Sequence, residues 1–143
     1  MRLHETRTIN RPLEDVFSFT ADFSNAETWD PGVESSNQVG DAPPQVGTEY
    51  ELMVNFGSNR IPMRYVITAL DPRSRVVLEG HGETLSAVDE ILFSATDTGT
   101  LVDYTADLRF ENWIRFVEPL LAPFLRRVVG RRALDGLVEA LER

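Results

Sequence analysis

Apolar and polar residues alternate along much of the chain, which is the period of strands that bury one face. From residue 33 onward, turn-forming residues interrupt this alternation at 40–44, 57–59, 71–74, 80–82 and 97–99. We therefore predict six consecutive antiparallel strands, each with one face in water. The clearest inner faces are Tyr50, Leu52, Val54 and Phe56 in one strand, and Val102, Tyr104, Ala106, Leu108 and Phe110 in another.

The first 32 residues predict one strand followed by two short helices. Residues 3–9 form the strand, and Pro12 is suited to the first turn of a helix because its missing N–H is not needed there. Glu14 and Asp15 follow in that turn, where negative charge favours the helix dipole. A second brief helix begins after residues 22–25 and ends at 29–32, where proline and glycine stop it.

Residues 113–141 are too long and too rich in leucine, valine and arginine for a strand. We predict one long helix, irregular at its start because of Pro119 and Pro123, with a bend near Gly130. This helix covers the apolar face of the sheet. The chain contains no internal repeat or linker, so residues 1–143 are expected to form a single α+β domain with the order β-α-α-β6-α.

Charge and composition limit the classes of binding partner and of reaction that this chain can have. The net charge is −9, which disfavours nucleic acid and anionic membrane surfaces. All 14 basic residues are arginine, and the absence of lysine and cysteine excludes Schiff bases, thiol nucleophiles and disulfides. No run approaches the roughly 18 apolar residues of a membrane span, so we expect a cytoplasmic protein without one.

Five motifs, in order, resemble the START-related superfamily, in particular its polyketide cyclase/dehydrase-like branch (SRPBCC). They are INRPLEDVF at 9–17, DFSN at 22–25 leading to WDPGV at 29–33, VGTEY at 46–50, VITALDP at 66–72 before RVVL at 75–78, and GTLVDY at 99–104. The resemblance covers nearly the whole chain. It implies a helix-grip fold, in which a seven-stranded curved antiparallel sheet wraps around the long C-terminal helix.

The resemblance also implies a cavity between sheet and helix for a hydrophobic or amphipathic molecule. It does not imply one chemistry, because members include carriers, sensors, cyclases, hydrolases and chaperone-associated domains. Function therefore has to be argued from the site itself.

Asp89 is the candidate catalytic residue. In its strand it shares a face with Leu85, Ala87, Ile91 and Phe93, so we expect it to point inward. Burial would raise its pKa and suit it to proton transfer or to hydrogen bonding with a ligand hydroxyl. The alternatives are a pair with arginine, a place at a wet pocket mouth, or a bulge that turns it outward.

Large apolar and aromatic residues are the candidates for binding a ligand. Three tyrosines are expected to point inward, where their hydroxyls would meet either a ligand or the backbone. The two tryptophans would close a pocket mouth or pack in the core, and the C-terminal helix would supply an apolar wall. The predicted ligand-binding set is Trp29, Tyr50, Phe56, Met63, Tyr65, Phe93, Tyr104, Trp113, Leu120 and Phe124.

The remaining polar groups suggest little chemistry. His81 belongs to the outer face of its strand, and His4 lies on a possible edge strand. With two distant histidines and no cysteine, we expect neither a structural metal nor a cofactor. Arg126, Arg127, Arg131 and Arg132 form a basic cluster that we interpret as a solvated face paired with carboxylates.

The leading hypothesis is therefore a carrier or sensor that binds a hydrophobic small molecule such as a lipid, sterol or polyketide. The second is a cyclase or dehydratase that uses Asp89 as acid/base, with Tyr65 or Tyr104 polarising a carbonyl. A third is a protein-interaction domain whose cavity is filled by side chains. The sequence leaves these open, along with the choice between monomer and homodimer.

Overall fold

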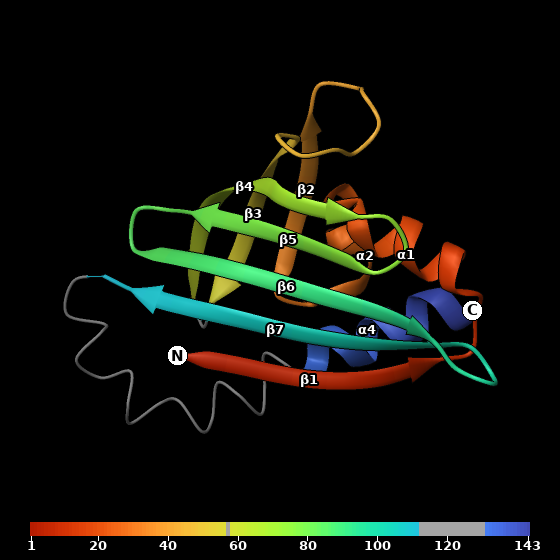
Figure 1. Cartoon of the computed structure of the whole chain (residues 1–143). Helices are drawn as coiled ribbons and strands as arrows, with labels where there is room; N and C mark the ends of the chain where they lie inside the picture. The colour runs from red at the N-terminus through yellow and green to blue at the C-terminus, as the bar shows by residue number, and fades with distance from the viewer. Residues whose placement is uncertain (57, 112–130) are drawn as a thin grey trace.

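The computed structural model describes residues 1–56, 58–111 and 131–143, which form one antiparallel sheet with helices on one side of it (Figure 1). The predicted irregular helix start and the bend at Gly130 lie outside the described residues. The elements are β1 Arg2–Ile9, α1 Leu13–Ala21, the 3-10 helix η1 Phe23–Asn25, α2 Ala26–Trp29, β2 Val33–Val39, β3 Glu49–Phe56, β4 Asn59–Asp71, β5 Arg75–His81, β6 Leu85–Ala95, β7 Thr100–Phe110 and α4 Arg131–Glu142.

The sheet has seven strands in the order β1-β7-β6-β5-β4-β3-β2. Each of β2 to β7 therefore pairs with its neighbour in sequence, and β1 adds to the far edge by pairing with β7. The predicted six-stranded meander, the preceding strand and the α+β class are confirmed. Short turns connect β3 to β7 in sequence, since antiparallel neighbours need only a tight connection, and a longer loop at 40–48 connects β2 to β3.

Two bulges in the sheet were not predicted. The pairing register shifts between Val33 and Ser35 in β2 and between Ile67 and Ala69 in β4. A bulge inserts an extra residue into one strand, which bends that strand and increases its twist. Both shifts lie in the half of the sheet that curls around the helices in Figure 1.

The short helices are placed by side chains at their ends. The carboxylate of Asp22 accepts hydrogen bonds from the backbone N–H and the hydroxyl of Ser24, at 3.1 and 2.6 Å, and so starts η1. Helix α2 ends at Trp29, because Pro31 disfavours helical geometry at the residue before it. Asp30 is therefore extended, and α2 delivers it to the inner side of the sheet.

Helix α4 packs against β1 and α2. Its buried residues Ala133, Leu134, Leu137 and Leu141 form one stripe along the helix. At its edges, Arg7 donates to Asp135 at 3.0 Å, and Arg11 donates to the carbonyl oxygen of Leu141 at 2.9 Å. No helix within the described residues is both long and apolar enough to cross a membrane.

Candidate functional site

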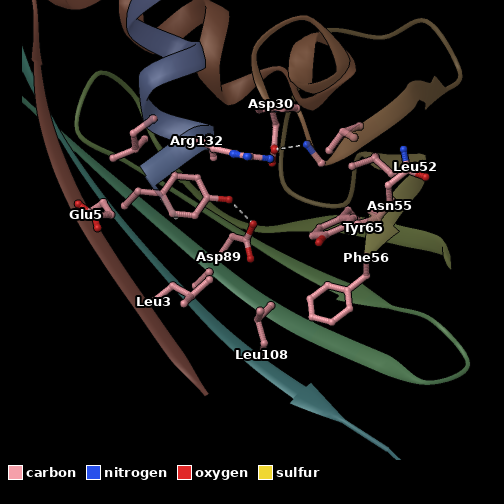
Figure 2. A pocket seen from close by; sticks show the side chains of 18 of the residues that line it. Leu3, Glu5, Asp30, Leu52, Asn55, Phe56, Tyr65, Asp89, Leu108 and Arg132 are labelled. Carbon is pink, nitrogen blue, oxygen red and sulfur yellow. Dashed lines mark hydrogen bonds between the residues drawn. The ribbon is translucent and has the colours of Figure 1, made fainter. Parts of the chain in front are cut away.

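A cavity of about 410 Å³ lies between the concave face of the sheet, the turn after α2 and the start of α4 (Figure 2). Most of its wall is apolar, as expected of a small-molecule site. The described residues that line it are Leu3, His4, Glu5, Phe23, Asp30, Pro31, Gly32, Val33, Leu52, Val54, Asn55, Phe56, Tyr65, Leu85, Asp89, Tyr104, Ala106, Leu108, Arg132, Ala133 and Leu134.

Asp89 points into this cavity from the middle of the sheet. It pairs in regular register with Leu78 of β5 and Ala106 of β7, and it is 5% exposed. No bulge turns it outward, and no arginine among the described residues pairs with it. Oδ2 accepts a hydrogen bond from the Tyr104 hydroxyl, whereas Oδ1 is buried without a partner in the described part of the chain. Asp89 is thus a buried acid with spare hydrogen-bonding capacity.

The surroundings of Asp89 favour its protonated form. Burial raises its pKa to about 7, the hydrogen bond from Tyr104 lowers it, and the negative charges of Asp30 and Asp107 raise it. Near neutral pH this carboxyl group therefore exchanges readily between its two forms. Burial, followed by the charge of Asp89, also raises the pKa of Tyr104 well above its usual value, so this phenol stays protonated and donates.

Asp30 is a second carboxylate in the cavity, and the sequence did not single it out. Burial raises its pKa to about 6, while the N–H of Gly32, donated to Oδ1 at 2.8 Å, lowers it. Figure 2 shows its carboxylate directed into the cavity. The only sequence signal was its position directly after Trp29, within one of the motifs of the family resemblance.

Tyr65 provides a phenol without a hydrogen bond to any described residue. Burial, followed by the charges of Asp89 and Asp30, raises its pKa well above the usual value. Its ring lies directly over Gly80 of β5, where an added Cβ would come within 2.6 Å of the ring. Glycine at position 80 therefore leaves the space that holds this ring against the sheet, with Phe23 packed beside it at 5.3 Å between ring centroids.

The rim of the cavity carries both signs of charge. Glu5 of β1 binds Arg7 at 3.2 Å and Arg131 at 3.7 Å, and His4 is hydrogen-bonded to Asp103 at 2.6 Å. Arg132, in the first turn of α4, is exposed and has no ion pair with a described residue. The basic cluster is therefore divided: Arg131 is paired as expected, Arg132 lines the cavity, and Arg126 and Arg127 lie outside the described residues.

The predicted ligand-binding residues do not all meet at the cavity. Phe56, Tyr65 and Tyr104 line it together with Asp89. Trp29, Tyr50, Met63 and Phe93 are buried in the core and are not among the lining residues. Alternation places the three strand residues Tyr50, Met63 and Phe93 on the inner face. Neighbouring rings pack against three of the four buried residues: Trp29 and Tyr50 against Phe23, and Phe93 against Phe17. Trp113, Leu120 and Phe124 lie outside the described residues.

Other candidate chemistry gains no support from the described residues. His81 is exposed at the end of β5, on the outer side of the sheet. Within the described ranges, no three histidine or acidic side chains are grouped so that they could hold a metal ion. Apart from His4, Glu5, Asn55 and Arg132, the acidic and phenolic side chains of the described lining residues are therefore two carboxyl groups and two phenols.

Comparison with known proteins identifies the fold. The Thermus thermophilus protein TTHA0849 superposes with a TM-score of 0.81 at 18% identity, over 99% of this chain and 97% of that one. The Zhui aromatase/cyclase from Streptomyces sp. R1128 gives 0.74 at 16%, over 99% and 90%. The structure of Ara h 8.0201 gives 0.66 at 15%, over 99% and 95%. These likenesses confirm the helix-grip fold.

The sequence comparison is more specific than the structural one. No curated protein sequence matches this chain. Residues 1–142, however, match the family described as polyketide cyclase / dehydrase and lipid transport, in agreement with the motifs quoted above. Since this match covers nearly the full length, the chain belongs to the polyketide cyclase / dehydrase and lipid transport family.

Proposed function

We propose that the protein binds a hydrophobic small molecule in the cavity between the sheet and α4. The observation that carries this proposal is the cavity of about 410 Å³, which is of the size that small-molecule sites have. Its apolar wall would bury the body of a ligand, at a gain of about 25 cal/mol for each Å² of apolar surface removed from water. Asp89, Asp30 and Tyr65 would orient the ligand through polar contacts.

Filling the cavity should abolish this binding. Leu108 lines the cavity from β7, and tryptophan at this position would project into the space a ligand needs. We expect Leu108→Trp to weaken binding of the neutral apolar dye Nile red at least about tenfold, a loss of about 1.4 kcal/mol. Fluorescence titration measures the affinity, and thermal unfolding shows whether the variant is folded.

The matched control is Leu92→Trp, because Leu92 is 39% exposed and lies on the outer face of β6. This variant should bind the dye as the unaltered protein does. Equal dye affinity in a folded Leu108→Trp protein would contradict binding in this cavity.

A second function, cyclisation or dehydration of a polyketide-like substrate, is favoured by the pKa of Asp89, which burial raises to about 7. A general base is most effective when its pKa lies near the working pH. The Asp89 carboxylate would remove a proton from a carbon between two carbonyls, and this carbon would attack a distant ketone to form the ring C–C bond, while the ketone oxygen takes that proton and becomes a hydroxyl. Asp89 would then remove the second proton of the same carbon and give it to the departing hydroxyl, which leaves as water with formation of a C=C bond. Tyr65 would donate to the carbonyl oxygen, because the Tyr104 hydroxyl already donates to Asp89.

Replacement of Asp89 by asparagine distinguishes these two functions. If Asp89 is the acid/base, Asp89→Asn should lower turnover of a linear poly-β-ketone thioester at least about 100-fold, because no proton can be exchanged at this position. Mass spectrometry would follow the loss of water from the substrate, with Nile red binding as the control for an intact cavity. A folded variant with full turnover would exclude this mechanism.

A further inference from the structure

Apart from the rim residues His4, Glu5 and Arg132, the charged side chains of the described residues that line the cavity are acids. Asp89 and Asp30 line it from opposite sides, one on the sheet and the other after α2, and Tyr65 and Tyr104 add two phenols (Figure 2). The negative charges of Asp89 and Asp30 raise the pKa of both tyrosines, so each phenol interacts electrostatically with both carboxylates. The four groups therefore form one electrostatically coupled set.

No cation within the described residues neutralises this set. Glu5 and His4 at the rim are engaged with Arg7, Arg131 and Asp103. Arg132 is exposed to water, which screens its charge, and it is not among the groups that shift the pKa of Asp30. An unpaired carboxylate in a cavity is costly, and in the absence of a cation the cost is met by protonation.

The carboxylates also have unused acceptor positions. Asp89 Oδ1 is buried with no hydrogen-bond partner in the described ranges, on a residue that is 5% exposed. Among the described residues, only the N–H of Gly32 donates to the carboxylate of Asp30. Acceptor positions that no described residue fills, beside an apolar wall, are complementary to a ligand that brings both a donor and a positive charge.

We propose that the cavity binds an apolar molecule carrying a cationic amine, with the ammonium group held by the carboxylates of Asp89 and Asp30. This inference rests on the proposed binding function and adds the chemical class of the ligand. An ammonium supplies three donors and the missing charge, whereas a fatty acid would bring a like charge to two acids.

Affinity for an amine should rise with pH. An ammonium binds the ionised carboxylates, and both carboxyl groups change from protonated to ionised between pH 5 and pH 8. An alkyl ammonium itself stays charged throughout, since its pKa resembles the value of about 10.4 for lysine. A neutral alcohol of the same length should show no such rise.

The test compares decylamine, 1-decanol and decanoate by isothermal titration calorimetry at pH 5 and pH 8. At pH 8 decylamine should bind at least about tenfold more tightly than decanol, because hydrogen bonds to charged groups are stronger than those between neutral groups. Decanoate should bind most weakly, because it brings a like charge to the two acids. At pH 5 the preference for the amine over decanol should shrink to about threefold or less.

Substitutions show which carboxylates cause the preference for decylamine over decanol. Asp89→Asn and Asp30→Asn should each remove most of the preference for decylamine over decanol at pH 8. Asp97→Asn, on the exposed turn between β6 and β7, removes the same charge from a protein of net charge −9 and should keep the preference. His4→Gln should keep the pH dependence.

The outcomes separate the two proposals. Equal binding of decylamine and decanol at pH 8, or tighter binding of decanoate, would overturn the amine inference and leave apolar binding standing. A preference that survives in both folded cavity variants would overturn it too, since the ammonium would then lie elsewhere. Failure of all three ligands to bind would overturn the binding function and the inference together.

Discussion

Raising the pH from 5 to 8 is expected to destabilise the protein, and Asp89→Asn should remove most of that loss. Asp89 has a pKa of about 7 in the folded protein, against its ordinary value of 3.8. An acid whose pKa is higher in the folded state holds more protons there, so its contribution is present at low pH and is lost as pH rises through the folded pKa. Between pH 5 and the folded pKa of about 7, the free energy of unfolding therefore falls by about 3 kcal/mol.

Urea unfolding of both proteins at several pH values measures this effect. The free energy of unfolding of Asp89→Asn, relative to the unaltered protein, should increase by about 2–3 kcal/mol between pH 5 and pH 8. Asp30, whose pKa is raised to about 6, contributes a smaller loss of the same sign in both proteins. The free energy of unfolding of Asp97→Asn should change with pH as that of the unaltered protein does. If the free energy of unfolding of Asp89→Asn also changed with pH as in the unaltered protein, Asp89 would ionise normally.

The second large effect is expected at Gly136, where α4 crosses α2. A Cβ added to Gly136 would lie 1.9 Å from the carbonyl oxygen of Trp29, which is backbone and cannot rotate away. Alanine favours a helix interior over glycine by about 1 kcal/mol, but forcing the two helices apart costs more. We expect Gly136→Ala to lower the free energy of unfolding by about 2–3 kcal/mol.

Urea unfolding followed by circular dichroism tests this expectation. Glu139→Ala is the matched control in the same helix, because Glu139 is exposed and bonds only Arg143 at 3.5 Å among the described residues. The control should change the free energy of unfolding by no more than about 0.5 kcal/mol. A stabilised Gly136→Ala protein would show that helix propensity outweighs the close contact, and that α4 does not pack on α2 as described.

The fold was predictable because its signals are local. Glycine, proline and aspartate mark the strand ends, and the alternation of side chains placed Asp89, Tyr50 and Tyr65 on the inner face, where all three are buried. The start of α1 after Pro12 has the same local origin. Such features depend on a few neighbouring residues, so one sequence suffices to infer them.

The composition of the cavity depends on contacts between distant segments. Asp30 enters it because α2 docks against α4, and Tyr104 bonds Asp89 because β6 and β7 pair in one particular register. Alternation identifies the inner face but not which residues there remain uncovered, so it could not separate Tyr65 at the cavity from Tyr50 in the core. The predicted catalytic role of Asp89 stays a prediction.

Native mass spectrometry of the protein purified from its own host tests the proposed binding function most directly. The gentle conditions keep a bound molecule in place, and denaturation then releases it for identification. Binding in the cavity predicts one apolar adduct per chain, absent from Leu108→Trp and present in Leu92→Trp. A bare protein mass that stays bare after decanol or decylamine is added would contradict it.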